Sequence, residues 1–252
     1  MEKPGRSGRR ANVRLKDQIT IITGGGRGIG KALALAFARE GSHVVLVART
    51  EPEILATASE VQQQGQKALP LKVDVSREEE VREMVQKSME TFGRIDTLIN
   101  NAGVLTPRVP LVEVSTQDWD LTLEVNLKGT FLCCREVLPV MMKQRTGSII
   151  NLSSGVVHRV ATHWGPYAIS KVAVEYLTKV LAEEVKAYGI RVNSVNPGKA
   201  ATRMRALAYP EEDPATLPKP EDITEVFVYL ASSEAKEVTG QSLDARQWKP
   251  SH

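Results

Sequence analysis

The chain has 252 residues, of which 42% are hydrophobic and 25% charged, which is typical of a globular protein with one large domain. These proportions exclude collagen-like, disordered and small disulfide-stabilised proteins. The net charge is +3, but residues 1–16 hold six cations and one acid, so we expect a flexible basic tail there and one domain over residues 17–252. A cationic tail without a basic folded face argues against nucleic-acid binding.

The cysteines, histidines and apolar runs exclude further classes. Cys133 and Cys134 are adjacent in an apolar run, so we expect buried thiols of a reducing compartment. The four histidines lack metal-ligand spacing, so no metal is predicted. No apolar run approaches the roughly 18 residues of a membrane span, and the polar start lacks a secretory signal's apolar core. A cytoplasmic protein is favoured, with organelle targeting by the basic leader as the alternative.

From residue 17 onward, short β-branched runs alternate with longer amphipathic segments. The expected strands are Gln18–Thr23, His43–Ala48, Ala68–Val73, Thr97–Asn100, Ser148–Leu152 and Arg191–Asn196, with a weak seventh at Gln241–Leu243. The expected helices are Ile29–Glu40, Pro52–Gln64, Glu78–Phe92, Gln117–Gln144, Tyr167–Tyr188 and Pro220–Ser232. This order predicts an α/β fold, a single doubly wound parallel sheet of the Rossmann type with helices on both faces.

Three local signals refine these bounds. Ser76 followed by Glu79 predicts a capping box for the third helix. Glycines stand just past four expected helix ends, at Gly41, Gly65, Gly93 and Gly189. The segment Arg203–Lys219 has three prolines and little periodicity, so we expect a surface loop beside the ligand-binding edge of the sheet.

Residues 23–30 read TGGGRGIG between the first strand and the first helix. In this context a glycine-rich turn lets a pyrophosphate approach the amide groups at a helix N-terminus. The register fits GxxxGxG with Gly24, Gly28 and Gly30. The alternative is a tight turn that is packed for its own sake.

The end of the second strand favours one nicotinamide cofactor over the other. An acid there would bind the ribose hydroxyls of NAD, but Arg49 stands in its place. Together with Arg27, Arg49 could hold a 2′-phosphate, which favours NADP over NAD. The alternatives are a solvated arginine at a strand end and a ribose contact from Glu51.

Tyr167 and Lys171 share one face of an expected helix. A nearby cation lowers the pKa of a phenol from about 10 towards the catalytic range, although such a pair is also common on exposed helices. Ser153 and Ser154 follow the fifth strand, where a hydroxyl could polarise a carbonyl or simply form a turn. The absence of a GxSxG turn argues against a serine hydrolase.

Together these motifs resemble the short-chain dehydrogenase/reductase family. The matching residues, in the family's order and spacing over about residues 15–243, are TGGGRGIG at 23–30, Asn100-Asn101-Ala102-Gly103, Asn126, Ser154, Tyr167-x-x-x-Lys171 and Asn196-Pro197-Gly198. The resemblance implies an NADP-dependent oxidoreductase acting on a carbonyl or secondary alcohol, most similar to 3-oxoacyl thioester reductases. A non-catalytic NADP-binding regulator or scaffold is the alternative.

The resemblance also implies site residues and assembly. Tyr167 would be the general acid/base, Lys171 would lower its pKa and bind the nicotinamide ribose, Ser154 would orient the carbonyl and Asn126 would hold a water. The implied cofactor contacts are Gly24, Gly26, Arg27, Gly28, Ile29 and Gly30 in the turn, Arg49 at the 2′-phosphate, Asp74 and Val75 at adenine, Asn101, Ala102 and Gly103 at its ribose, and Pro197, Gly198 and Thr202 at the nicotinamide. A homotetramer or dimer through the helices at 117–144 and 167–188 is implied as well.

Three features depart from the family's pattern. Ala200 replaces the usual Ile or Val, the segment between Thr202 and Pro220 is short, and residues 240–248 lack the usual Val-Asp-Gly-Gly. We therefore expect a reduced lid over the site. The loop after Thr202 is expected to shape the substrate pocket, or alternatively to lie on the surface. The same holds for the side chains of Arg108, His158, Arg159, His163 and Trp164.

Overall fold

The computed structural model describes residues 13–249. Seven strands form one sheet in the order β3-β2-β1-β4-β5-β6-β7, and every neighbouring pair is parallel. The strands are β1 (Ile19–Thr23), β2 (His43–Ala48), β3 (Ala68–Lys72), β4 (Thr97–Asn100), β5 (Gly147–Leu152), β6 (Ile190–Asn196) and β7 (Ser242–Asp244). The predicted doubly wound parallel sheet is confirmed.

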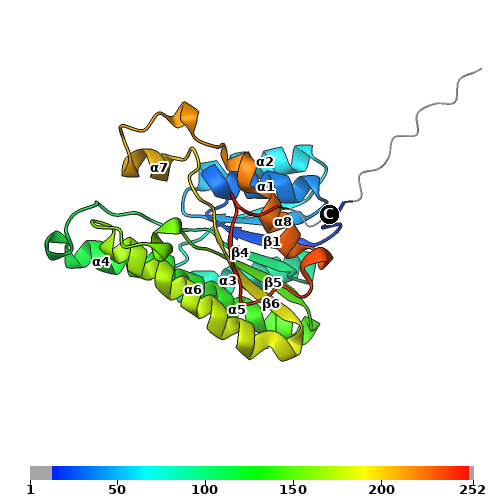
Figure 1. Ribbon diagram of the computed structural model, residues 1–252. Coiled ribbons are helices and arrows are strands. Elements are labelled where there is room, and N and C mark those ends of the chain that lie inside the picture. Colours follow the sequence, from blue (N-terminus) through cyan, green and yellow to red (C-terminus); the bar gives the residue numbers. More distant parts are fainter. Residues whose placement is uncertain (1–12, 250–252) are drawn as a thin grey trace, which may run out of the picture.

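Helices cover both faces of this sheet, and each layer has its own apolar core (Figure 1). One layer consists of α1 (Gly28–Arg39), α2 (Glu51–Gln63) and α8 (Glu225–Ala231). The other consists of α3 (Glu78–Phe92), α5 (Gly129–Gln144) and α6 (Gly165–Val185). Because side chains on both faces are buried, the central strands read as continuous apolar runs.

The single helix expected over 117–144 is continuous but changes its pitch. It consists of α4 (Thr116–Leu123), a π-helical turn (Glu124–Lys128) and α5. Such turns occur mostly as short insertions and often lie at functional sites. Here the π turn contains Asn126, one of the residues predicted to be catalytic.

Two local predictions are wrong. Ser76 does not cap α3: its hydroxyl donates to Asp74 Oδ1 at 2.8 Å, and α3 begins after Arg77 without a side-chain cap. The expected loop at 203–219 contains a short helix, α7 (Arg203–Ala208). Thr202 caps it by accepting the Arg205 amide at 3.2 Å, and six residues are too few to show a helical period.

The remaining helical segments are short. The 3₁₀ turns are Leu111–Glu113, Gly155–His158, Lys186–Tyr188, Pro214–Thr216, Pro220–Ile223 and Ser233–Ala235. The helix expected at 220–232 is therefore a 3₁₀ turn followed by α8. All four glycines predicted past helix ends have positive φ, as at Gly93, which ends α3 with φ of 75°.

The folded domain begins earlier than the predicted boundary at residue 16. Leu15 is buried in the core beside α1, and the Arg14 guanidinium donates to Glu40 at 2.9 Å and to Glu225 at 2.5 Å. Residues 13–16 therefore belong to the domain. The rest of the predicted tail, residues 1–12, lies outside the described residues.

Two further observations concern residues 13–249 only. No helix there is long and apolar enough to cross a bilayer, and no three His, Cys, Asp or Glu side chains gather as metal ligands would. Cys133 and Cys134 are both buried free thiols, as expected from their apolar surroundings. Burial also raises the pKa of both thiols.

Candidate active site

A cavity of about 480 Å³ opens at the carboxyl ends of the strands. Its walls come from the segments that follow β1 to β6 and from α7. In doubly wound sheets ligands bind at this edge, where the strand order reverses. That reversal lies between β1 and β4, whose following segments both line the cavity.

The turn after β1 needs glycine for local packing and backbone conformation, and it also lines the cavity. Gly24 and Gly28 have φ of 66° and 52°. A Cβ at Gly30 would stand 2.1 Å from the Gly24 carbonyl oxygen, so no side chain fits there. The first turn of α1 contains no acid, which leaves its amide groups suited to an anion.

Two arginines line the cavity near the ends of β1 and β2. Arg27 donates to Glu53 Oε1 at 3.2 Å, and Arg49 lies 3.9 Å from Asp74 Oδ2. More than half of each arginine side chain is exposed, and exposed ion pairs hold a guanidinium weakly. Both groups can therefore turn towards a phosphate.

A second acid at this end of the cavity, besides Asp74, is Glu53, which could not be singled out from the sequence. Glu53 lines the cavity and pairs with Arg27, whereas Glu51, the alternative ribose contact, is not among the lining residues. Glu51 and Glu53 both lie in the first turn of α2. Glu53 is the one that faces the glycine turn, as its pair with Arg27 and the packing of its Cβ against Gly26 show.

Ser154, Tyr167 and Lys171 come together in the cavity wall. Lys171 Nζ donates to the Leu152 carbonyl at 2.8 Å and lies 5.8 Å from the centre of the Tyr167 ring. Burial lowers the pKa of Lys171 to about 8. Burial also raises the pKa of Tyr167, against a smaller lowering effect of the hydrogen bond with Ser154.

The expected lowering of the Tyr167 pKa by Lys171 is therefore not found in this structure. Desolvation of the phenol is the larger effect, and the ammonium group donates its hydrogen bond to the Leu152 carbonyl. At neutral pH Tyr167 consequently holds its proton. This state suits proton donation to a substrate oxygen.

Asn126 lies behind the cavity wall and not in it. Its Oδ1 accepts the Val104 amide at 2.8 Å, and its Nδ2 donates to the Val104 carbonyl at 3.1 Å and to Ser170 Oγ at 3.2 Å. Because Val104 lines the cavity, Asn126 fixes part of the wall. Its proposed hold on a water molecule stays a prediction.

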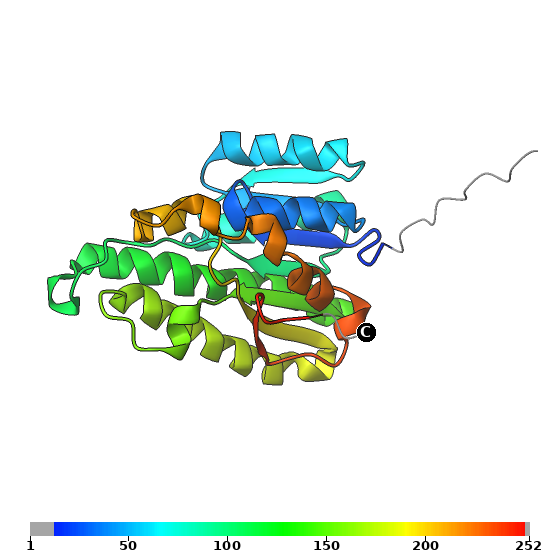
Figure 2. The same cartoon turned by 45° about the horizontal axis from the view of Figure 1, so that its top comes forward.

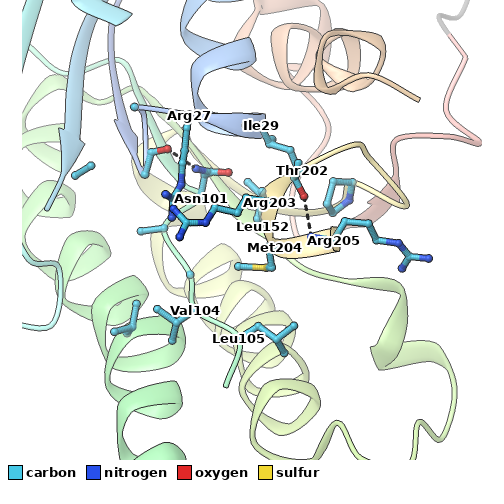
Figure 3. Close-up of a pocket in the computed structure, with 18 of the residues that line it drawn as sticks. Arg27, Ile29, Asn101, Val104, Leu105, Leu152, Thr202, Arg203, Met204 and Arg205 are labelled. Atoms are coloured by element: carbon cyan, nitrogen blue, oxygen red, sulfur yellow. Dashed lines mark hydrogen bonds between the residues drawn. The ribbon is translucent and has the colours of Figure 1, made fainter. Parts of the chain in front are cut away.

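Most of the other predicted cofactor contacts line the cavity. They are Gly24, Gly26, Gly28, Ile29, Asp74, Val75, Asn101, Ala102, Gly103, Pro197, Gly198 and Thr202. Gly30 is the exception, because it packs against Gly24 beneath the turn. The loop expected after Thr202 to shape the pocket contributes Arg203, Met204 and Arg205 to the lining, from the start of α7 (Figure 3).

The side of the cavity beside Tyr167 is aromatic. The rings of Trp164 and Tyr167 meet edge to face with centres 5.5 Å apart. The Arg108 guanidinium lies 4.7 Å from the centre of the Trp164 ring and 4.8 Å from that of Tyr209, and it donates to the Ala208 carbonyl. Arg108 thus joins the segment after β4 to α7, whose residues line the cavity.

Of the five side chains expected to shape the substrate pocket, only Trp164 lines the cavity. Arg108 acts through the contacts just described. The other three, which are absent from the lining, are His158, Arg159 and His163.

The unusual C-terminal segment still completes the sheet. Asn196 Nδ2 donates to Asp244 Oδ2 at 2.8 Å, which joins β6 to β7. Arg246 Cδ lies 2.4 Å from the point where a Cβ on Gly198 would stand. This segment therefore supports the backbone of the Pro197-Gly198 turn that lines the cavity.

Comparison with known proteins agrees with this geometry. Residues 18–213 match the short chain dehydrogenase family. The chain belongs to this family. It is 38% identical over 237 residues to the 3-oxoacyl-[acyl-carrier-protein] reductase FabG of Thermotoga maritima, covering 91% of this chain and 96% of that protein. It is also 34% identical over 235 residues to the uncharacterized oxidoreductase YciK of Escherichia coli K12, covering 92% and 93%.

The fold is likewise shared with solved members of the family. A short chain dehydrogenase from Shigella flexneri 2a complexed with NADP superposes with a TM-score of 0.88 at 33% identity. The alignment covers 94% of this chain and all of that one (100%). The resemblance inferred from the motifs is confirmed.

Proposed function

We propose that this protein is an NADP(H)-dependent reductase that transfers hydride between the nicotinamide and a carbonyl or secondary alcohol. The observation that carries the proposal is the convergence of Ser154, Tyr167 and Lys171 on one wall of a cavity whose far end holds Arg27 and Arg49. A non-catalytic nucleotide-binding protein has no evident need for that triad.

The cavity residues fit a dinucleotide phosphate. The first turn of α1 offers amide groups without a competing acid, which suits the pyrophosphate. Arg27 and Arg49 are held only by exposed pairs, and both would hold a 2′-phosphate through charge-assisted hydrogen bonds. The NADP complex of the Shigella flexneri relative supports the same choice of cofactor.

The side chains around Tyr167 fit the reduction of a carbonyl. When bound, the cofactor supplies the hydride. Tyr167, which holds its proton at neutral pH, gives that proton to the carbonyl oxygen, while the Ser154 hydroxyl stabilises the negative charge that develops there. Lys171 beside the phenol holds the nicotinamide ribose and favours the phenolate once the proton has left.

The similarity to FabG favours 3-oxoacyl thioesters as substrates. We would follow NADPH oxidation with these thioesters, diketones, quinones and steroid ketones, using NADH in parallel. We expect turnover with NADPH, and a loss of about 10²-fold to 10⁴-fold in Tyr167→Phe because the proton donor is removed.

The matched control is Tyr188→Phe, which removes a phenol in the 3₁₀ turn that follows the C-terminal end of α6. Its activity should equal that of the wild type. Tight NADPH binding without turnover on any of these substrates would contradict the reductase and favour a non-catalytic regulator. Equal turnover in Tyr167→Phe would contradict the role of the phenol.

We further propose that the protein pairs with a second copy through α5 and α6. Four apolar residues on α6 recur at helical spacing and are exposed: Ile169, Val172, Tyr176 and Val180. Beside them, Leu127, Phe131 and Leu177 line an apolar groove. Analytical ultracentrifugation should give a dimer or tetramer that Tyr176→Arg dissociates, and a wild-type monomer would contradict this assembly.

A further inference from the structure

The first residue of α7 is a cation that the proposed chemistry does not use. Arg203 lines the cavity. The preceding Thr202 carries a methyl carbon, Cγ2, that lies 3.5 Å from the point where a Cβ on Gly28 would stand. Because Gly28 begins α1, the start of α7 lies across the cavity from the first turn of α1.

The figures show where α7 lies and which way the Arg203 side chain extends. In Figures 1 and 2, α7 projects beyond the sheet at the end where α4 also projects. Figure 3 shows the Arg203 side chain extending from α7 towards Arg27 and Asn101, on the glycine-turn side of the cavity. The guanidinium is thus directed at the glycine turn.

The charges around Arg203 make this orientation informative. Within residues 13–249 Arg203 has no carboxylate partner, whereas Arg205 on the same helix pairs with Glu212 at 2.5 Å. Arg203 instead extends towards a second arginine, Arg27. Arg27 already has Glu53 as a partner at 3.2 Å, whereas Arg203 is exposed and lies at the cavity without one. An anion at the first turn of α1, which contains no acid of its own, would give Arg203 a partner.

We propose that Arg203 binds the pyrophosphate of the dinucleotide from the α7 side, opposite the amide groups of α1. This inference rests on the proposed function, since it needs a dinucleotide in the cavity. The pyrophosphate is the group expected at a helix N-terminus, and Thr202 places α7 against that turn. Arg49 and Asp74, by contrast, follow β2 and β3, at the part of the cavity where the 2′-phosphate is expected.

This contact would link cofactor binding to the position of α7. Arg108 already holds the C-terminal end of α7 on the substrate side through the Ala208 carbonyl. Arg203 would hold its N-terminal end on the cofactor side. A bound dinucleotide should therefore slow amide hydrogen exchange in α7, and removing the Arg203 guanidinium should weaken that effect.

The test is the equilibrium binding of NADP⁺ and NAD⁺ to Arg203→Gln, measured by calorimetry. Both ligands share the pyrophosphate, so we expect both dissociation constants to rise by a similar factor of about 10, typical of one charge-assisted hydrogen-bond pair. Arg203→Lys should recover part of the loss, because it keeps the charge but not the two-pronged geometry. Adenosine 2′-monophosphate, which lacks the pyrophosphate, should bind the wild type and Arg203→Gln equally.

Two controls make the result specific. Arg39→Gln carries the same charge change at the far end of α1 and should bind both dinucleotides as the wild type does. Arg49→Gln should weaken NADP⁺ and leave NAD⁺ unchanged.

Three other results would contradict the proposal. Unchanged binding of both dinucleotides by Arg203→Gln would refute the contact. A loss confined to NADP⁺ would refute the pyrophosphate assignment, because it would place Arg203 at the 2′-phosphate. If the wild type bound neither dinucleotide, the proposed function itself would fail.

Discussion

Replacing Lys171 by methionine should stabilise the fold while it abolishes activity. Lys171 is 5% exposed, and its ammonium group has one hydrogen-bond partner, the Leu152 carbonyl. Burial lowers its pKa from 10.5 to about 8. At about 1.4 kcal/mol per pH unit, the charged form is about 3 kcal/mol less favourable in the folded state than in the unfolded chain. Losing the hydrogen bond costs about 1 kcal/mol, so Lys171→Met should gain about 2 kcal/mol at pH 7.

The stability difference between Lys171→Met and the wild type should depend on pH in a defined direction. Below pH 8 the lysine is protonated in both states, and the folded state of the wild type carries the full cost of a buried charge. Between pH 8 and 10.5 the folded state loses its proton first, so the wild type regains stability as the pH rises. The advantage of Lys171→Met should therefore be constant below pH 8 and shrink above it.

Urea unfolding of the protein without dinucleotide, at pH 7 and at pH 9.5, measures both effects. The matched control is Lys179→Met on the same helix, an exposed position where we expect a change within about 0.5 kcal/mol. A Lys171→Met protein less stable than the wild type at pH 7 would refute the reasoning. So would a difference in the free energy of unfolding that is the same at both pH values.

Two further changes test the glycine turn and α7. Gly30→Ala should lower the free energy of unfolding by about 2–3 kcal/mol, because its Cβ would meet the Gly24 carbonyl oxygen. The control is Gly165→Ala, whose Cβ meets only the end of the exposed Leu111 side chain. It should cost less than about 1 kcal/mol in the same urea titration. Equal costs would show that the turn can relax. Arg108→Met should release the Ala208 carbonyl and speed amide exchange in α7, measured by mass spectrometry, with the core strands as an internal reference. Unchanged exchange in α7 would show that other contacts hold this helix.

The sheet could be predicted from the sequence because parallel strands with two buried faces are continuous apolar runs between helices. Pro70, within β3, is an exception to this strand pattern. A proline within a strand would ordinarily argue against it, but β3 lies at the edge of the sheet, where one row of amide groups has no neighbouring strand. The helix α7 could not be predicted, since its six residues complete fewer than two turns.

The residues that form the site could be predicted from the sequence, but their pKa values could not. Ser154, Tyr167 and Lys171 meet because strand ends and helix starts converge on one edge of the sheet, which the motif order already implies. The pKa of Tyr167 depends on how deeply the phenol is buried, which no spacing in the sequence reports. The direction of the Arg203 side chain could not be predicted for a related reason, because it depends on how closely Thr202 approaches Gly28.

The π turn at 124–128 also determines where the continuous helix of α4 and α5 could lose a residue. It holds one residue more than an α-helical turn needs, and each residue of an α-helix advances the side chains by about 100°. Deleting one residue there would restore regular pitch and leave the facing of α5 almost unchanged, because a π turn takes up its extra residue locally. The cost would fall on Asn126, which would leave the Val104 backbone. Deleting one residue within α5 would instead rotate Leu132, Cys133 and Val137 away from the sheet.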